Sequence, residues 1–196
     1  MSKKKSFNPV AVVYQFLFGV VTAVVATLVL SYPVFYLFVK MQKLNELVGL
    51  SVARVMRNYH ELMWYLLSPL QDKLRLSDFP TSVSGAKHFY EVKNLFQLAL
   101  AVFVVGILLW LFLKKKNYQL TISKATALLF MIIPIVILPF ALMNFDVFFT
   151  NFHQLLFNNS DWLFDPTTDP IINVLPEDFF ATMFSVFLLV YEIYFA

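Results

Sequence analysis

The feature that most constrains this chain is a set of four apolar runs, each close to the length of a membrane span. The longest covers residues 10–39 without a single charged side chain, and the others cover residues 94–113, 122–143 and 179–196. A helix needs ~20 predominantly apolar residues to cross the hydrocarbon core of a bilayer. Lipid offers no water to backbone N–H and C=O groups, so such runs are expected to be helices. The sequence therefore predicts an all-α membrane protein with four transmembrane helices.

The composition supports this interpretation. Hydrophobic residues make up 60% of the 196 residues and charged residues 14%, against about 45–50% and about 25% in an ordinary globular chain. The net charge of +3 is no sign of nucleic-acid binding, because the lysines lie beside the apolar runs, where they orient membrane helices. The absence of cysteine excludes disulfides, a thiol nucleophile and thiolate metal ligands.

Lysines also predict the orientation in the membrane. Three lie in the N-terminal tail, where the long run that follows indicates a retained signal-anchor helix, not a cleaved signal peptide. Four more, at 114–116 and 124, lie in the turn of residues 114–124 that joins the second and third runs. Helix parity puts both segments on one face, and the positive-inside rule makes that face cytoplasmic. We therefore expect one membrane domain, residues 1–196, with both termini inside and residues 40–93 and 144–178 forming an extracellular cap.

The first long segment of this cap is expected to contain an amphipathic helix. Apolar residues recur at helical spacing between residues 44 and 63, and the aromatic pair Trp64 and Tyr65 suits the headgroup level. The second half, residues 68–93, is expected to be irregular, because Pro69, Pro80 and Gly85 interrupt it.

The second long segment contains the strongest candidate for chemistry. Between residues 145 and 180 it holds six acidic residues, no Lys or Arg, and His153 among aromatic neighbours. His88 lies shortly before the second run, so both histidines are expected at the same outer interface. Imidazole, with an ordinary pKa of ~6.5, can take and return a proton at neutral pH. Alternatively, both histidines serve only as interfacial anchors. His60 is expected to be an ordinary surface residue, and Glu192 a polar contact of the last span.

The choice of nucleophile narrows the possible enzymes. Cysteine is absent, and the serines outside the membrane lie in no GxSxG-type turn. If an acyl group is moved, the sequence favours direct attack by a group of the substrate, with histidine as the base.

Two other classes stay open at this point. A metal-dependent hydrolase would use His88, His153, Asp165 and Asp169, although no HExxH or similar ligand spacing is present. The DPTTDP sequence around these aspartates is first of all typical of turns, which gives Asp165 and Asp169 a structural role. A transport or scaffold protein without enzymatic activity is the third possibility.

Three segments carry a family resemblance: FHQLLFNNSDWLFDPTTDPIINVLPEDFF after the third run, SGAKHFYEVKNLF before the second, and NYHELMWYL in the first long segment. Together they resemble the lipoprotein intramolecular transacylase (Lit) family of Gram-positive bacteria. The resemblance implies a multi-pass cell-membrane enzyme with four transmembrane helices and an extracellular cap. It also implies transfer of the sn-2 acyl chain of a diacylglyceryl-cysteine onto that cysteine's α-amino group. The partners would be a diacylated lipoprotein and membrane lipids.

The resemblance also assigns residues. The two family histidines correspond to His88 and His153. We expect His153 to be the general base and His88 to assist the leaving oxygen or the developing oxyanion. No cofactor or metal is needed, because the ester itself supplies the acyl group. The expected substrate-binding residues form two groups. Aromatic side chains would form the walls of the site: Phe89, Phe149, Phe152, Trp162 and Phe164. Two tyrosines are possible hydrogen-bond donors: Tyr65 and Tyr90.

Overall fold

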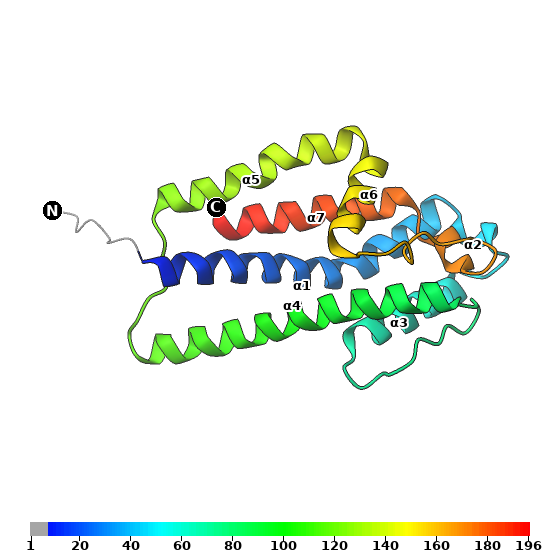
Figure 1. The fold of residues 1–196 in the computed structure, drawn as a ribbon, viewed down its shortest axis with the longest axis horizontal. Coiled ribbons are helices and arrows are strands. Elements are labelled where there is room, and N and C mark those ends of the chain that lie inside the picture. The colour runs from blue at the N-terminus through cyan, green and yellow to red at the C-terminus, as the bar shows by residue number, and fades with distance from the viewer. Residues whose placement is uncertain (1–7) are drawn as a thin grey trace. The chain divides into compact units, whose positions relative to one another are not determined.

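The computed structural model describes residues 8–196, apart from the side chains of residues 140–142. Every regular element in that range is helical, which confirms the all-α class. In chain order the elements are α1 (Pro9–Met41), α2 (Leu44–Leu47), α3 (Val52–Leu67), α4 (Val83–Lys115), α5 (Lys124–Met143), α6 (Phe145–Leu156), the 3₁₀ helix η1 (Pro170–Val174) and α7 (Glu177–Phe195). Figure 1 traces them from the N-terminus to the C-terminus by colour.

Three of these helices, α1, α4 and α7, are long and apolar enough to cross a membrane. The apolar part of α5 over the described side chains, Lys124–Pro139, is shorter. Helix α5 stays helical although Pro134 and Pro139 lie inside it. The four predicted apolar runs therefore all appear as helices, and three of these are long and apolar enough to span a membrane over the described residues.

The structure corrects the prediction of an irregular chain up to residue 93. Helix α4 begins at Val83, well before the apolar run, and is continuous into that run. The Ser82 hydroxyl accepts a hydrogen bond from the Gly85 N–H at 2.9 Å, so this serine satisfies a free donor of the first helical turn. A Cβ at Gly85 would collide with the Asp169 carboxylate, so the close approach at this position requires glycine.

The predicted amphipathic helix of the first long segment is divided in two. Gly49 adopts a φ of 63°, a left-handed conformation that favours glycine, and it separates α2 from α3. Ser51 then caps α3 by accepting a hydrogen bond from the Arg54 N–H at 3.3 Å. The expected helix was therefore correct for α3 and wrong for the residues that join it to α2.

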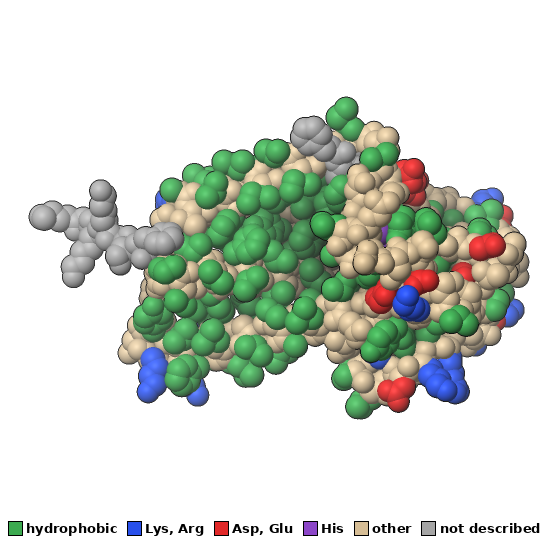
Figure 2. Space-filling view, viewed as in Figure 1, with side chains coloured by type: hydrophobic (Ala, Val, Ile, Leu, Met, Phe, Trp, Pro, Cys, Tyr) green, Lys and Arg blue, Asp and Glu red, His purple; other side chains and the backbone are tan. Residues whose placement is uncertain are grey.

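Tertiary contacts divide the chain into two compact units, and the first consists of residues 1–29, 99–143 and 184–196. Its buried cluster is formed by Ala23, Tyr191 and Phe195. The Tyr194 hydroxyl donates to Gln15 Oε1 at 2.6 Å, which joins α7 to α1. Hydrophobic side chains cover most of the visible surface of α1, α5 and α7 in this unit (Figure 2). These are surfaces suited to lipid.

The second unit consists of residues 30–98 and 144–183. Here the apolar face of α3 packs on the last turns of α1. Tyr59 stacks on Phe35 with ring centroids 4.0 Å apart, and its hydroxyl donates to Ser31 Oγ at 2.7 Å. Phe179, in the first turn of α7, contacts both rings. The amphipathic character of α3 is therefore satisfied by protein contacts within this unit.

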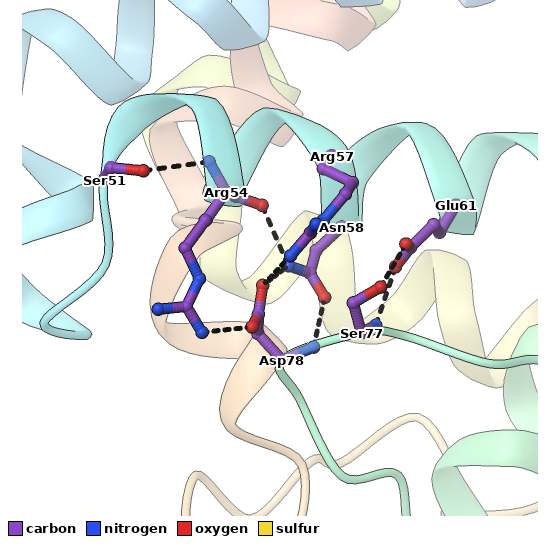
Figure 3. A network of polar contacts seen from close by, with 7 residues as sticks. All are labelled: Ser51, Arg54, Arg57, Asn58, Glu61, Ser77 and Asp78. Carbon is purple, nitrogen blue, oxygen red and sulfur yellow. Dashed lines mark hydrogen bonds and ion pairs between the residues drawn. The ribbon is translucent and has the colours of Figure 1, made fainter.

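A polar network holds the irregular residues 68–82 against α3 (Figure 3). Asp78 pairs with Arg54 and Arg57, and it accepts a hydrogen bond from Asn58 Nδ2 at 2.7 Å. The adjacent guanidinium of Arg54 is the main reason why the pKa of the Asp78 carboxyl falls to about 2. One turn further along α3, Glu61 accepts a hydrogen bond from the Ser77 N–H at 2.7 Å.

Candidate active site

The two histidines singled out by the sequence lie next to each other in the second unit. His88 is in the N-terminal part of α4, before the apolar run of that helix, and His153 is in the last turn of α6. Their ring centroids are 5.7 Å apart. Both side chains are buried, with 6% and 9% of their surface exposed. Helix α6 was not foreseen from the sequence, and it is the element that brings His153 to His88.

A backbone contact determines which nitrogen of His153 is free. His153 Nδ1 lies 2.8 Å from the carbonyl oxygen of Phe149, one turn earlier on α6. A carbonyl oxygen can only accept, so Nδ1 carries the hydrogen, and in the neutral ring Nε2 is left with its lone pair. Burial lowers the pKa of His153, while the bond to Phe149 opposes that shift. At neutral pH the ring is therefore an uncharged base with a defined orientation.

His88 has a different environment. Its Nδ1 is buried and has no hydrogen-bond partner in the described part of the chain. Burial lowers the pKa of His88 to about 4, with a contribution from the charge that His153 carries when protonated, and Asp161 opposes both effects. A buried polar atom without a partner costs about 1–3 kcal/mol, and such atoms in native structures often mark sites of function.

Aromatic side chains enclose both histidines. The Phe149 ring lies 4.0 Å from His153 and the Trp162 ring 5.0 Å, measured between centroids. Phe152 is 5.8 Å from His153, and Phe164 is 5.6 Å from His88. Phe89 packs on Phe164 at 5.1 Å. The structure thus brings all five predicted aromatic walls to the histidine pair or to its immediate neighbours.

The two predicted tyrosines do not join this group. The Tyr65 ring lies under the ammonium group of Lys93, 4.6 Å from the ring centroid. Tyr90 is 55% exposed. Over residues 8–196, no hydrogen bond connects either hydroxyl to a histidine. A role for either tyrosine as a donor at the site stays a prediction.

One close neighbour was missed by the sequence reasoning. Phe157 is buried and meets the edge of the His88 ring at 4.8 Å, with His153 at 5.7 Å. The signal was present, because Phe149, His153 and Phe157 follow each other at intervals of four, which places them on one face of a helix.

The two aspartates of the DPTTDP sequence accept hydrogen bonds from within the protein. Asp165 Oδ1 accepts hydrogen bonds from the Thr167 N–H at 2.8 Å and from its hydroxyl at 2.7 Å. Asp169 is 2% exposed and accepts from the Ser82 N–H at 2.7 Å, next to the start of α4. Among the described residues, no three His, Asp or Glu side chains converge in a way that could hold a metal ion.

Long apolar helices together with a buried histidine pair define a helical, membrane-integral protein with a candidate acid–base site. A model of the family "Lipoprotein intramolecular transacylase Lit" matches residues 10–180. The chain belongs to this family, which confirms the resemblance found in the sequence. It is therefore an enzyme of the transacylase class.

Solved structures agree with the family assignment. The chain is similar to the membrane integral lipoprotein intramolecular transacylase Lit from Bacillus cereus, with 32% identity, a TM-score of 0.78, and coverage of 95% of this chain and 88% of the other. Two structures of that protein with one histidine replaced, by arginine or by alanine, match at 30% identity. Their TM-scores are 0.71 and 0.66, with 95% and 93% of this chain and 84% of the other covered in both cases. No curated protein matches the sequence.

Proposed function

We propose that this transacylase moves the sn-2 acyl chain of a diacylglyceryl-modified N-terminal cysteine onto the α-amino group of the same cysteine. The product is a lyso-form lipoprotein with an N-acyl chain and one acyl chain left on the glycerol. The observation that carries the proposal is the His153 ring, whose Nδ1–H is fixed on the Phe149 carbonyl while its Nε2 stays free to accept a proton.

His153 acts as the general base in this proposal. An α-amino group has a pKa of ~7.7–8.0, so it is largely protonated at neutral pH and must lose a proton before it attacks an ester. The ammonium form releases this first proton to water. Nε2 then takes a second proton from the same nitrogen as the new C–N bond forms at the ester carbonyl. The C–O bond to the glycerol then breaks, and the imidazolium of His153 returns the proton to the departing oxygen. No external acyl donor or cofactor enters the balance.

His88 stabilises the negative charge that develops on the carbonyl oxygen. Its pKa of about 4 keeps the ring neutral at physiological pH, so it acts as a hydrogen-bond donor and not as a cation. A neutral imidazole can polarise a carbonyl in this way. Such donors are most effective where water is excluded, and the burial of the His88 ring among Phe157 and Phe164 supports this.

The aromatic side chains around the histidines are proposed to hold the glyceryl group of the substrate folded, so that the amine lies next to the ester carbonyl. Donor and acceptor belong to one molecule, so the main barrier is to order a flexible glyceryl group. Ordering of this kind contributes up to ~7–11 kcal/mol in favourable cases. Phe149, Phe152 and Trp162 beside His153 would limit the freedom of the head and keep out water, which would otherwise hydrolyse the ester.

The proposed topology puts both termini in the cytoplasm and the histidine pair at the outer membrane surface. Support comes from Lys114–Lys116 and Lys124, which flank the turn between α4 and α5 and orient it inward by the positive-inside rule. The histidines lie toward the opposite end of α4 from those lysines. Residues 40–93 and 144–178 then face outward, where diacylated lipoproteins are displayed.

Mass spectrometry of a lipoprotein's N-terminal peptide tests the proposed chemistry. Cells carrying His88→Ala or His153→Ala should contain the diacylglyceryl form and no lyso-form, while the membranes still contain the folded enzyme. His60→Ala is the matched control, because His60 is exposed and its Nδ1 lies 3.3 Å from the hydroxyl of Tyr32, away from the pair. Unchanged lyso-form product in both active-site variants would contradict the proposal.

A further inference from the structure

Residues 157–164 connect the two histidines to a part of α4 that the proposed chemistry does not use. This segment carries Trp162, which packs on His153 at 5.0 Å, and Phe164, which packs on His88 at 5.6 Å. It has no helix or strand of its own. Its position must therefore come from side-chain contacts.

Two polar contacts fix this segment to α4, one helical turn apart. Lys87 Nζ pairs with Asp161 Oδ2 at 2.5 Å. Asn159 Nδ2 donates to both carboxylate oxygens of Glu91, at 2.9 Å and 3.2 Å. Lys87 directly precedes His88, and Glu91 follows it by one turn, so the segment is held at the level of the histidine.

Asn159 also organises the segment internally. Its side-chain oxygen accepts from the Asp161 N–H at 3.0 Å, and its backbone oxygen accepts from the indole N–H of Trp162 at 3.0 Å. One residue therefore joins α4, the turn of the segment and the aromatic ring that contacts His153. Four hydrogen bonds at one residue thus link the indole of Trp162 to the Glu91 carboxylate on α4.

We propose that Asn159 and Glu91 are positioning residues for acyl transfer, which hold Trp162 so that the His153 ring keeps its Nε2 in line with the substrate amine. This inference rests on the proposed role of His153 as general base. A catalytic group must be held within ~0.5 Å of its productive position by the residues around it. A displacement of ~1 Å can cost ~10²-fold in rate.

Exchanging the hydrogen-bond donor and acceptor between Asn159 and Glu91 tests their positioning role. Asn159→Asp places a carboxylate against the Glu91 carboxylate and should lower kcat at least ~10-fold. Adding Glu91→Gln supplies an amide donor to the new carboxylate, which can still accept from the Asp161 N–H. The double variant should therefore recover most of the lost kcat, whereas Asn159→Asp alone should not.

A second measurement reports the position of Trp162 directly. The chain has three tryptophans, so an enzyme with Trp64→Phe and Trp110→Phe emits from Trp162 alone. In that background Asn159→Asp and Glu91→Ala should shift the emission to longer wavelength, because the released indole meets water. The double variant should reverse the shift. Glu61→Ala is the control. Glu61 on α3 makes a similar carboxylate contact, with Ser77 of the connecting segment (Figure 3), and its loss should change neither kcat nor emission.

The inference is overturned if folded Asn159→Asp enzyme keeps its kcat, or if the double variant recovers nothing. Should Asn159→Asp not fold, Glu91→Ala decides, and unchanged kcat with unchanged Trp162 emission would refute the positioning role. If His153 is not the general base, the result differs from these: His153→Ala would stay active, whatever the Trp162 emission shows.

Discussion

The two long segments of the second unit use their polar residues in opposite ways. In the first, Asp78 is satisfied by Arg54, Arg57 and Asn58, and its partners lie on α3 (Figure 3). Around the second, two histidines are buried among aromatic rings, and one ring nitrogen of His88 has no partner in the described chain. Paired charges hold a segment in place. Two buried imidazoles, one of them with an unpartnered nitrogen, cost stability, and their presence indicates that this pair is kept for chemistry.

The largest test of this contrast compares His153→Ala with Asp78→Ala. Loss of a general base typically costs ~10²–10⁴-fold in rate, so His153→Ala should abolish most turnover and leave melting in detergent nearly unchanged. Asp78→Ala should do the reverse, because Arg54 and Arg57 lose their common partner and residues 68–82 lose one of their attachments to α3. Single-turnover rates normalised to folded enzyme, together with melting temperatures, separate the two. Equal loss of rate per folded molecule in both variants would break the contrast.

The contrast could be foreseen only in part from the sequence. His88 and His153 were expected at one interface because of their distances to the ends of the apolar runs, and the structure places them next to each other. Their aromatic neighbours were expected from the composition around them. Helix α6 was missed because Asn, Asp and Pro dominate residues 158–170, and the whole segment was interpreted as a loop. The extension of α4 to Val83 was missed because Gly85 was taken as a helix breaker.

Other features of the site depend on tertiary packing. Gly85 is needed because the Asp169 carboxylate lies against it, and Asp169 bonds to Ser82 across 87 positions of sequence. No local pattern specifies such a contact. The same holds for Asn159 and Glu91, which are 68 positions apart. The bond from His153 to Phe149, by contrast, is local, and it would have followed from the sequence once residues 145–156 were recognised as helical.

The pH dependence of the reaction sharpens the comparison further. Burial lowers the pKa of both imidazoles, to about 4 for His88. The base must be neutral, so the acid limb of kcat should have its midpoint below the ordinary histidine value of ~6.5. A midpoint at or above ~6.5 in single-turnover assays would contradict this. Stability has the same sign: the unfolded chain binds a proton more readily than buried His88, so this contribution is complete above ~6.5 and is lost as the pH falls toward about 4.

The smallest expected effect concerns Asp161, the one charge of the second segment that acts on a histidine. Its carboxylate favours the protonated form of His88 and so raises the pKa of that ring, against the larger effect of burial. Asp161→Asn removes this charge, which disfavours the imidazolium, so the pKa of His88 should fall further below its present value of about 4. NMR titration of the imidazole measures the shift.

Asp165→Asn is the matched control, because that carboxylate bonds to Thr167 within its own turn and should leave the His88 titration unchanged. A rise in the pKa of His88 in Asp161→Asn would show that the segment had moved away and admitted water, which would make the two polar contacts on α4 a barrier to solvent as well as an anchor.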